Sequence, residues 1–513
     1  MIEVGVTEIL RAIERFLETS QDPMLCEPGE EWLAITKENF VLEGRAACVQ
    51  LQAWDQNRNL VRRVIAIERE TRGKLVLKVA RFGKLQGTLE LIDRRRAERE
   101  NVPLRGARLE FREQFRRFLR RQFTAYKLAE LSTEADLEHT LSPAYPRALL
   151  RQGAAAWAAI GAAPDGAHPD GVLTFGLIWL DYLRQREPSL AIQGLVLYLP
   201  AGHAKTTCLR LLYLDPAAAQ YSAFVFDEQG LEERIDLHDY GNLDTHLEPY
   251  RRRTLDHSFG GAHHQVETGV ESVDRSDGEL SFRVHGLEFA RSAGLQLLMG
   301  LETKRPASQS SAAVWASELS RVRCADAADR RHPLYLKNPE AWLESQVRSH
   351  IQEIDASLLP APVYGQVPAF AAADRGVLDL LAVDHRGRLA VIELKASEDV
   401  HLPLQALDYW MRVMWHLERR EFQANGYFPG RELLREPARL LLVSPALDIH
   451  PSNERVLRYL SPQIPVERVG VGLEWRRELK VMLRSGSPQQ PHVNPSFPAR
   501  ERRDPQSGSG RYS

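Results

Sequence analysis

Two short apolar segments in the last third of the chain carry charged residues where a folded protein normally keeps apolar ones. Residues 376–383 read GVLDLLAV, and residues 389–397 read LAVIELKAS. Both have the length of a strand, and the turn residues between them favour a hairpin. Charged side chains in buried strands are costly unless they are paired or bind a metal. We therefore expect one shared site formed by Asp379, Glu393 and Lys395.

The spacing of these residues favours a metal site. Because strand side chains alternate with a period of two, Glu393 and Lys395 lie on the same face. The hairpin brings Asp379 beside Glu393. Two carboxylates near an ammonium group suit a hard cation such as Mg²⁺ or Mn²⁺. Such an ion can activate water and stabilise the leaving oxygen, while the lysine positions that water and contacts the phosphate.

The elements around this hairpin follow the order helix, strand, strand, strand, helix, strand. Asn338 and Pro339 are typical of a helix cap and a first helical position. The expected elements are a helix at 338–351, a strand at 362–370, the hairpin, a helix at 403–418 and a strand at 438–445. This order predicts an α/β domain with a central mixed sheet.

The motif residues within this order resemble a known family. Asp379 followed by Glu393-Leu394-Lys395 resembles the D…ExK signature of PD-(D/E)XK phosphodiesterases. Gln405 and Tyr409, four residues apart on one helix face, resemble the QxxxY element of its RecB-like branch. The resemblance implies a restriction-endonuclease-like domain at residues 334–484. It also implies a metal-dependent endonuclease or exonuclease, with DNA as its partner.

The resemblance also implies further site residues. Gln405 and Tyr409 would lie beside the metal centre. An acidic residue of the first helix would assist it, and Glu344 fits that position best, with Glu340 one turn earlier. Gln366 is a further candidate neighbour. The expected metal ligands are Asp379, Glu393 and Glu344.

Other interpretations of the same residues stay open. Glu393 and Lys395 could form an ion pair at a sheet edge, with Asp379 in a turn. A nuclease-like scaffold could bind nucleic acid or regulate it without cutting. A phosphodiesterase of this kind could also act on RNA. The sequence does not distinguish repair, recombination and defence against foreign DNA.

Length and composition indicate a multidomain soluble protein. The 513 residues predict about three or four domains. Four scattered cysteines without a CxxC pair argue against a zinc site or disulfide framework, and they fit a reducing compartment. The N-terminus lacks a signal-peptide pattern, and no apolar run of about 18 residues predicts a membrane span. We therefore expect a cytoplasmic protein without a membrane partner.

The N-terminal half combines a β-rich region with a basic helix. Residues 1–93 predict strands, and residues 94–130 form an Arg-rich helical segment. Residues 94–121 hold eleven arginines against four acidic residues, while the whole chain has a net charge of −2. The arginines that recur on one helix face are Arg108, Arg112, Arg116 and Arg120. They predict either a phosphate-contacting surface or a solvated face with local ion pairs.

The middle of the chain suggests an internal repeat. Residues 131–240 predict an α/β region in which residues 154–237 show the order strand, helix, strand ending in proline, helix, hairpin. The same order begins at the strand that carries Glu393. The first copy would lack the catalytic motifs and could only bind or scaffold, with chance similarity as the alternative. Residues 241–333 predict a connecting β/α region, and residues 485–513 a disordered tail.

Two weaker motifs do not change this interpretation. The segment LPAGHAKTT at 199–207 lacks the glycines of a phosphate-binding loop, so no nucleotide cofactor is expected. A Gly-containing loop carries possible metal ligands but fits a solvated loop better: Asp256, His257, His263 and His264. A homo-oligomer or a protein partner is compatible with the sequence.

Overall fold

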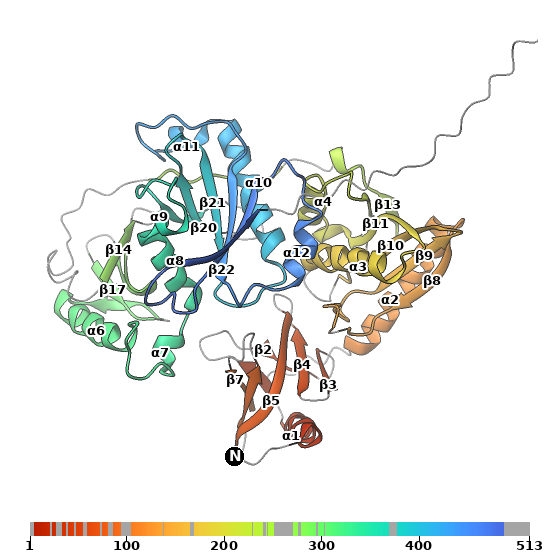
Figure 1. The fold of residues 1–513 in the computed structure, drawn as a ribbon, viewed down its shortest axis with the longest axis horizontal. Coiled ribbons are helices and arrows are strands. Elements are labelled where there is room, and N and C mark those ends of the chain that lie inside the picture. Colours follow the sequence, from red (N-terminus) through yellow and green to blue (C-terminus); the bar gives the residue numbers. More distant parts are fainter. Residues whose placement is uncertain are drawn as a thin grey trace, which may run out of the picture.

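The chain folds into several sheets flanked by helices, an α/β multidomain architecture with two mixed sheets (Figure 1). The computed structural model describes residues 5–20, 23–26, 33–36, 39–45, 48–54, 59–71, 74–80, 86–93, 104–136, 138–164, 169–227, 229–239, 243, 245–250, 270–274, 279–293, 296–301, 303–368 and 377–486. The predicted loop with Asp256 and its neighbouring histidines lies outside these residues.

The N-terminal region is an antiparallel sheet with one amphipathic helix against it. Its seven strands run in the order β2-β1-β7-β6-β5-β4-β3. Helix α1 (Val6–Thr19) buries Ile9, Ile13 and Phe16 in the core of this sheet. The strands are β1 (Pro23–Cys26), β2 (Leu33–Ala34), β3 (Phe40–Gly44), β4 (Val49–Trp54), β5 (Asn59–Thr71), β6 (Lys74–Ala80) and β7 (Gln86–Asp93).

The Arg-rich helix α2 (Leu104–Gln122) opens the first α/β unit, a name used below for residues 104–239. Its buried phenylalanines, Phe111, Phe115 and Phe118, pack on a six-stranded mixed sheet. The strands are β8 (Lys127–Ser132), β9 (Arg147–Gln152), β10 (Ala155–Gly161), β11 (Ala191–Pro200), β12 (Gln220–Phe226) and β13 (Glu232–Arg234). Helix α3 (Val172–Arg186) joins β10 to β11, and α4 (Lys205–Leu211) joins β11 to β12.

The second α/β unit, residues 338–486, has the element order predicted for it. Helices α8 (Pro339–Ser349) and α9 (Ile351–Ile354) precede the sheet, and Asn338 caps α8 as expected. The strands are β19 (Tyr364–Pro368), β20 (Val377–Val383), β21 (Leu389–Leu394), β22 (Arg439–Pro445), β23 (Val466–Val471) and β24 (Val481–Gly486). Helices α10 (Leu402–Glu418) and α11 (Glu421–Ala424) precede β22, and α12 (Ser452–Leu457) precedes β23.

The two mixed sheets share one topology. In each sheet, neighbouring strands are consecutive in the chain, from β8 to β13 and from β19 to β24. In each sheet the first two neighbouring pairs are antiparallel, the next two are parallel and the last is antiparallel. The strand order that the sequence suggested for residues 154–237 is therefore found in both units. Ser485 and Gly486 belong to β24, so the expected tail does not begin at residue 485.

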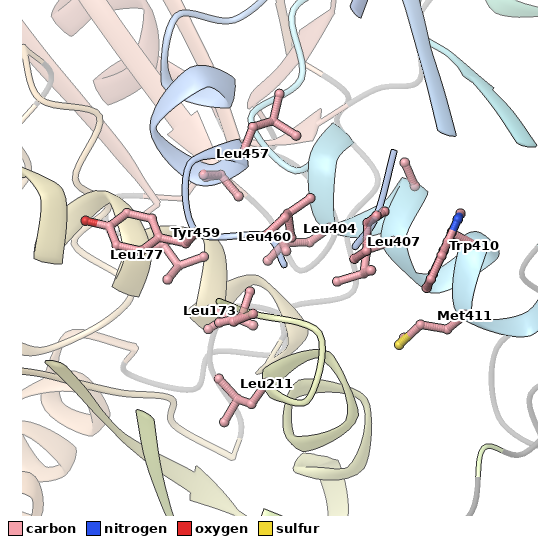
Figure 2. Packing of buried hydrophobic residues seen from close by; sticks show 14 of the residues in the cluster. Leu173, Leu177, Leu211, Leu404, Leu407, Trp410, Met411, Leu457, Tyr459 and Leu460 are labelled. Carbon is pink, nitrogen blue, oxygen red and sulfur yellow. The ribbon is translucent and has the colours of Figure 1, made fainter. Parts of the chain in front are cut away.

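The two α/β units bury one continuous apolar core where they meet. Residues from α3 and α4 of the first unit and from α10 and α12 of the second belong to the same cluster. Figure 2 shows Leu177 and Leu211 facing Leu404 and Leu457 across this junction. Trp54 of β4 joins the same cluster. Apolar packing of this kind holds the two units as one body.

A five-stranded antiparallel sheet lies on the other side of the second unit (Figure 1). Its strands are β14 (Val270–Asp274), β15 (Leu280–Val284), β16 (Leu287–Ala293), β17 (Gln296–Met299) and β18 (Arg305–Ala307), followed by α6 (Gln309–Val322) and α7 (Pro333–Leu336). Residues 241–333 were expected to connect the two halves of the chain and to pack on one of them. They include a sheet that packs against α8.

The docking element of this sheet is the tight turn between β15 and β16. Both turn residues, His285 and Gly286, have positive φ, as a two-residue hairpin turn requires. His285 stacks on Trp342 of α8 with ring centroids 4.8 Å apart. A Cβ on Gly286 would stand 1.7 Å from the carbonyl oxygen of Ala341. Buried Arg323 donates to the His285 carbonyl oxygen at 3.1 Å, which ties the turn to α6.

Candidate functional site

The predicted hairpin of β20 and β21 brings Asp379 and Glu393 together. Leu380 pairs with Ile392 across the antiparallel ladder, which places Asp379 opposite Glu393. The Asp379 carboxylate accepts a hydrogen bond from the Leu394 N–H, with Oδ2 2.8 Å from that nitrogen. This bond fixes one carboxylate oxygen of Asp379 against β21.

Glu393 is an acidic residue in an almost fully buried strand. The residue is 3% exposed, and its Oε2 is buried without a hydrogen-bond partner among the described residues. Burial raises its pKa well above the usual range, and the charge of Asp379 raises it further. Burial likewise raises the pKa of Asp379. Two adjacent carboxylates that resist ionisation are held where a cation would compensate their charge.

Lys395 lies on the same face of the chain as Glu393, as the alternation predicted. Its Nζ is 4.0 Å from Glu393 Oε1, 3.7 Å from Glu340 Oε1 and 3.9 Å from Asp399 Oδ2. Burial alone would lower the pKa of the ammonium group, but these carboxylates and Asp379 raise it overall. Lys395 is therefore a fixed positive charge within an acidic site.

Of the two glutamates of helix α8, Glu340 lies near the ammonium group of Lys395, and Glu344 pairs with arginines instead. Glu344 pairs with two guanidinium groups, Arg348 Nε at 3.0 Å and Arg283 Nη1 at 3.6 Å. The charges of Glu340 and Glu344 both raise the pKa of Asp379, so both lie near the site. The docked sheet, through Arg283, thus holds the residue that the sequence favoured as a third metal ligand.

Helix α10 brings Tyr409 near the hairpin of β20 and β21. Burial raises the pKa of Tyr409, and the charges of Glu393 and Asp379 raise it further. Gln405 lies one turn earlier and is half-buried. Gln366 lies in β19, next to β20 in the sheet. The structure therefore brings Tyr409 to the hairpin, while no contact between Gln405 and the hairpin carboxylates is found in the described part of the chain.

Asp399 is the site residue that the sequence did not reveal. It follows Lys395 by four residues, in the turn before α10. Its Oδ1 accepts a hydrogen bond from the His401 N–H at 2.7 Å, and its Oδ2 faces Lys395. Residues 395–399 do not form a helix, so the four-residue spacing from Lys395 gave no signal that Asp399 lies near it.

The donor set of the site fits a hard divalent cation. Asp379 and Glu393 offer carboxylate oxygens, one of them buried and unpartnered within the described residues. No group of three histidine, cysteine, aspartate or glutamate side chains with metal-holding geometry occurs among the residues that the structure describes. Two carboxylates suffice for Mg²⁺, which usually keeps several waters and takes its remaining ligands from substrate phosphates.

The predicted arginine face of α2 is divided between local contacts and solvent. Arg116 pairs with Glu113 at 3.2 Å, and the Arg108 guanidinium lies 6.0 Å from the Trp54 ring centroid. Arg112 is half-buried, whereas Arg120 is exposed. The face keeps its positive charge, and Arg120 is its most accessible member.

Comparisons with known proteins found no matching family model, no similar curated protein and no similar solved structure. Among the described residues, no helix is both long and apolar enough to cross a membrane.

Proposed function

We propose that this protein is a metal-dependent nuclease that hydrolyses phosphodiester bonds of DNA. One observation carries the proposal: Asp379, Glu393 and Lys395 meet at one hairpin, and Glu393 Oε2 is buried without a hydrogen-bond partner among the described residues. Lys395 offers one positive charge to the acidic residues around it, which are Glu340, Asp399, Glu393 and Asp379, so a bound cation would compensate the excess negative charge. The resemblance to a restriction-endonuclease-like domain supports the same function.

In this proposal each residue has a defined task. Asp379 and Glu393 hold Mg²⁺ or Mn²⁺, which supplies Lewis-acid stabilisation of the phosphate when bound. Lys395 orients the attacking water and contacts a phosphate oxygen. The water oxygen forms a bond to phosphorus, and the bond to the leaving sugar oxygen breaks. That oxygen takes up one proton to become a hydroxyl group, and the other water proton passes to solvent. Glu340 and Asp399 hold the ammonium group of Lys395 in place.

The remaining candidate residues act around this centre. Glu344, held by Arg283 and Arg348, shapes the electrostatic field at Asp379. Tyr409 approaches the site from α10, and Gln405 lies one turn earlier on the same helix. The arginines of α2 provide a basic surface for the phosphate backbone outside the catalytic hairpin, where each neutralised phosphate releases counterions.

The deciding experiment is cleavage by the metal-stripped full chain after Mg²⁺ or Mn²⁺ is added. Labelled single-stranded DNA, duplex DNA, branched DNA and RNA are the substrates. We expect cleavage of DNA that EDTA abolishes and that falls at least about 1,000-fold in Asp379→Asn and Lys395→Met. Exposed Glu432→Gln is the matched control and should keep full activity. Equal behaviour of wild type and Asp379→Asn on every substrate would refute the proposal.

A further inference from the structure

The two α/β units share one hydrogen-bond register, so residues of one unit can be matched to residues of the other. Ala162 N–H donates to the Tyr198 oxygen at 2.9 Å, just after β10. Lys395 N–H donates to the Val443 oxygen at 3.0 Å, just after β21. Both acceptors stand two residues before the proline that ends the neighbouring strand, Pro200 or Pro445. Ala162 therefore corresponds to Lys395.

This register shows what the first unit has at the catalytic positions. Ile160, two residues before Ala162, corresponds to Glu393. Ile160 pairs with Arg147 in the ladder, so Arg147 stands where the second unit has Asp379. Arg147 is buried and donates to the Glu134 carbonyl oxygen at 2.7 Å. With isoleucine, alanine and a hydrogen-bonded arginine at these positions, the first unit has no carboxylates to hold a metal there.

The contact between the units is reciprocal at its centre. The segments YLDP at 213–216 and YLSP at 459–462 occupy the same place after α4 and α12. Leu214 and Leu460 form an antiparallel bridge. Asp215 N–H donates to the Tyr459 oxygen at 2.8 Å, and Ser461 N–H donates to the Tyr213 oxygen at 2.8 Å. Matched residues exchanging matched bonds are the mark of a two-fold, isologous contact.

Charged contacts across the junction are of the same kind, although their two arginines do not stand at matched positions. The segments Leu-Asp-Tyr at 180–182 and at 407–409 occupy α3 and α10. Asp408 of α10 pairs with Arg210 of α4 at 2.6 Å, while Asp181 of α3 pairs with Arg455 of α12 at 3.8 Å. Each aspartate thus meets an arginine on the later helix of the other unit. Figure 2 shows the matched leucines, Leu177 with Leu404 and Leu211 with Leu457, in the core between them.

We infer that the chain is a fused pair of nuclease-like units about an approximate two-fold axis, with one catalytic centre, and that it nicks one strand of duplex DNA per binding event. The inference rests on the nuclease function proposed above. The antiparallel strands of a duplex are related by local two-fold axes, so a protein pair of the same symmetry presents one centre to each strand. The loss of one centre leaves one strand uncut. Each event consumes one water and breaks one phosphodiester bond.

The test is cleavage of supercoiled plasmid by the full chain with Mg²⁺ or Mn²⁺, at a concentration where light scattering gives its mass in solution. We expect a monomer that converts all supercoiled DNA to open circles before linear DNA accumulates. Glu393→Gln should abolish nicking, whereas nicking that survives at more than about a tenth of the wild-type rate reveals a centre elsewhere and overturns the inference.

Further outcomes separate this inference from the proposed function. Linear DNA that appears at the rate at which supercoiled DNA disappears overturns single-strand nicking but leaves the nuclease intact. Cleavage of linear duplex without cleavage of circular plasmid is exonuclease activity, so it also overturns single-strand nicking and leaves the nuclease intact. A stable dimer of chains that cuts both strands also overturns it. Absence of cleavage from every nucleic acid removes the proposed function itself and the inference with it.

Discussion

Arg210 and Asp408 form a two-point ion pair inside the core that the two α/β units share. Arg210 Nη2 is 2.6 Å from Asp408 Oδ2, and Arg210 Nε is 2.8 Å from Oδ1. Their side chains are 6% and 14% exposed, so solvent does little to screen the pair. Asp408 directly precedes Tyr409 on α10. The pair therefore links the first unit to α10, the helix that carries Tyr409.

Breaking this pair should cost much more than breaking an exposed one. Asp408→Ala leaves the buried Arg210 charge without its carboxylate, and we expect the free energy of unfolding to fall by about 3–5 kcal/mol. Chemical denaturation measures this loss. The control is Glu436→Ala, which removes an exposed partner of Arg386 at 3.4 Å and should cost less than about 1 kcal/mol. Equal losses for the two variants would contradict a structural role for the buried pair.

The turn at Gly286 offers a test of the contact between the five-stranded sheet and α8. Gly286→Ala places a methyl group against the Ala341 carbonyl oxygen, so the turn must move away from α8. Gly230 has a similar φ, +78° against +75°, but nothing lies within 4 Å of a Cβ there. We expect Gly230→Ala to cost about 1 kcal/mol from backbone strain alone.

Gly286→Ala should cost at least about 2 kcal/mol more, because it adds a clash in a packed contact. It should also lower the proposed cleavage rate, since α8 carries Glu340 to Lys395. Thermal unfolding and plasmid cleavage of the two variants provide the measurements. If both variants lose the same free energy of unfolding and cleave DNA at the wild-type rate, the turn does not position α8.

The hairpin of β20 and β21 was predictable because its information is local. Two strand-length apolar runs separated by a Gly-containing turn determine the pairing, and the period of two places Glu393 and Lys395 on one face. The element order around it was predictable for the same reason. The choice between Glu340 and Glu344 was not, since both lie on α8 and their partners come from distant elements. Arg283, on the docked sheet, binds Glu344.

For the relation between the two units, too, one part was predictable from the sequence and another was not. Element order along residues 154–237 indicated a repeat, because strand and helix patterns do not depend on the residues at the site positions. Which position replaces which catalytic residue could not be read from the order alone. It requires the ladder register that pairs Ile160 with Arg147. The reciprocal bridge between Leu214 and Leu460 joins residues 246 positions apart, and no local pattern predicts such a contact.

The partly buried carboxylate of Asp379 predicts an unusual pH dependence for the metal-free protein. Burial raises the pKa of Asp379 to about 7, above the value of about 3.9 for an unfolded chain. Between these pH values the folded state holds a proton that the unfolded chain releases. The free energy of unfolding of metal-free protein should therefore fall as the pH rises from about 4 to about 7.

Asp379→Asn removes this charge and should stabilise the metal-free protein at pH 8 by about 1–3 kcal/mol, with little effect at pH 4. Mg²⁺ or Mn²⁺ should raise the Tm of wild type at pH 8 and leave this variant unchanged. Asp326→Asn, whose side chain is 71% exposed, is the control and should behave as wild type in both respects. A lower Tm for Asp379→Asn at pH 8, or an equal metal shift in both proteins, would contradict the buried metal site.

The basic face of α2 predicts the salt dependence of nucleic-acid binding. Arg116→Gln with Arg120→Gln removes two positive charges from that face. If both side chains contact phosphates, the slope of log affinity against log salt should become shallower by about 2 for duplex DNA. Fluorescence anisotropy with the inactive Asp379→Asn background measures this slope without cleavage.

The matched control changes the same number of charges elsewhere. Arg321 and Arg431 are exposed residues outside the first unit, and their joint change to glutamine also lowers the net charge by two. This control should leave the slope within experimental error of the background, because long-range charge is screened over about 10 Å at 0.1 M salt. Equal slopes for both double variants would show that α2 presents a solvated face and that phosphate contacts lie elsewhere on the chain.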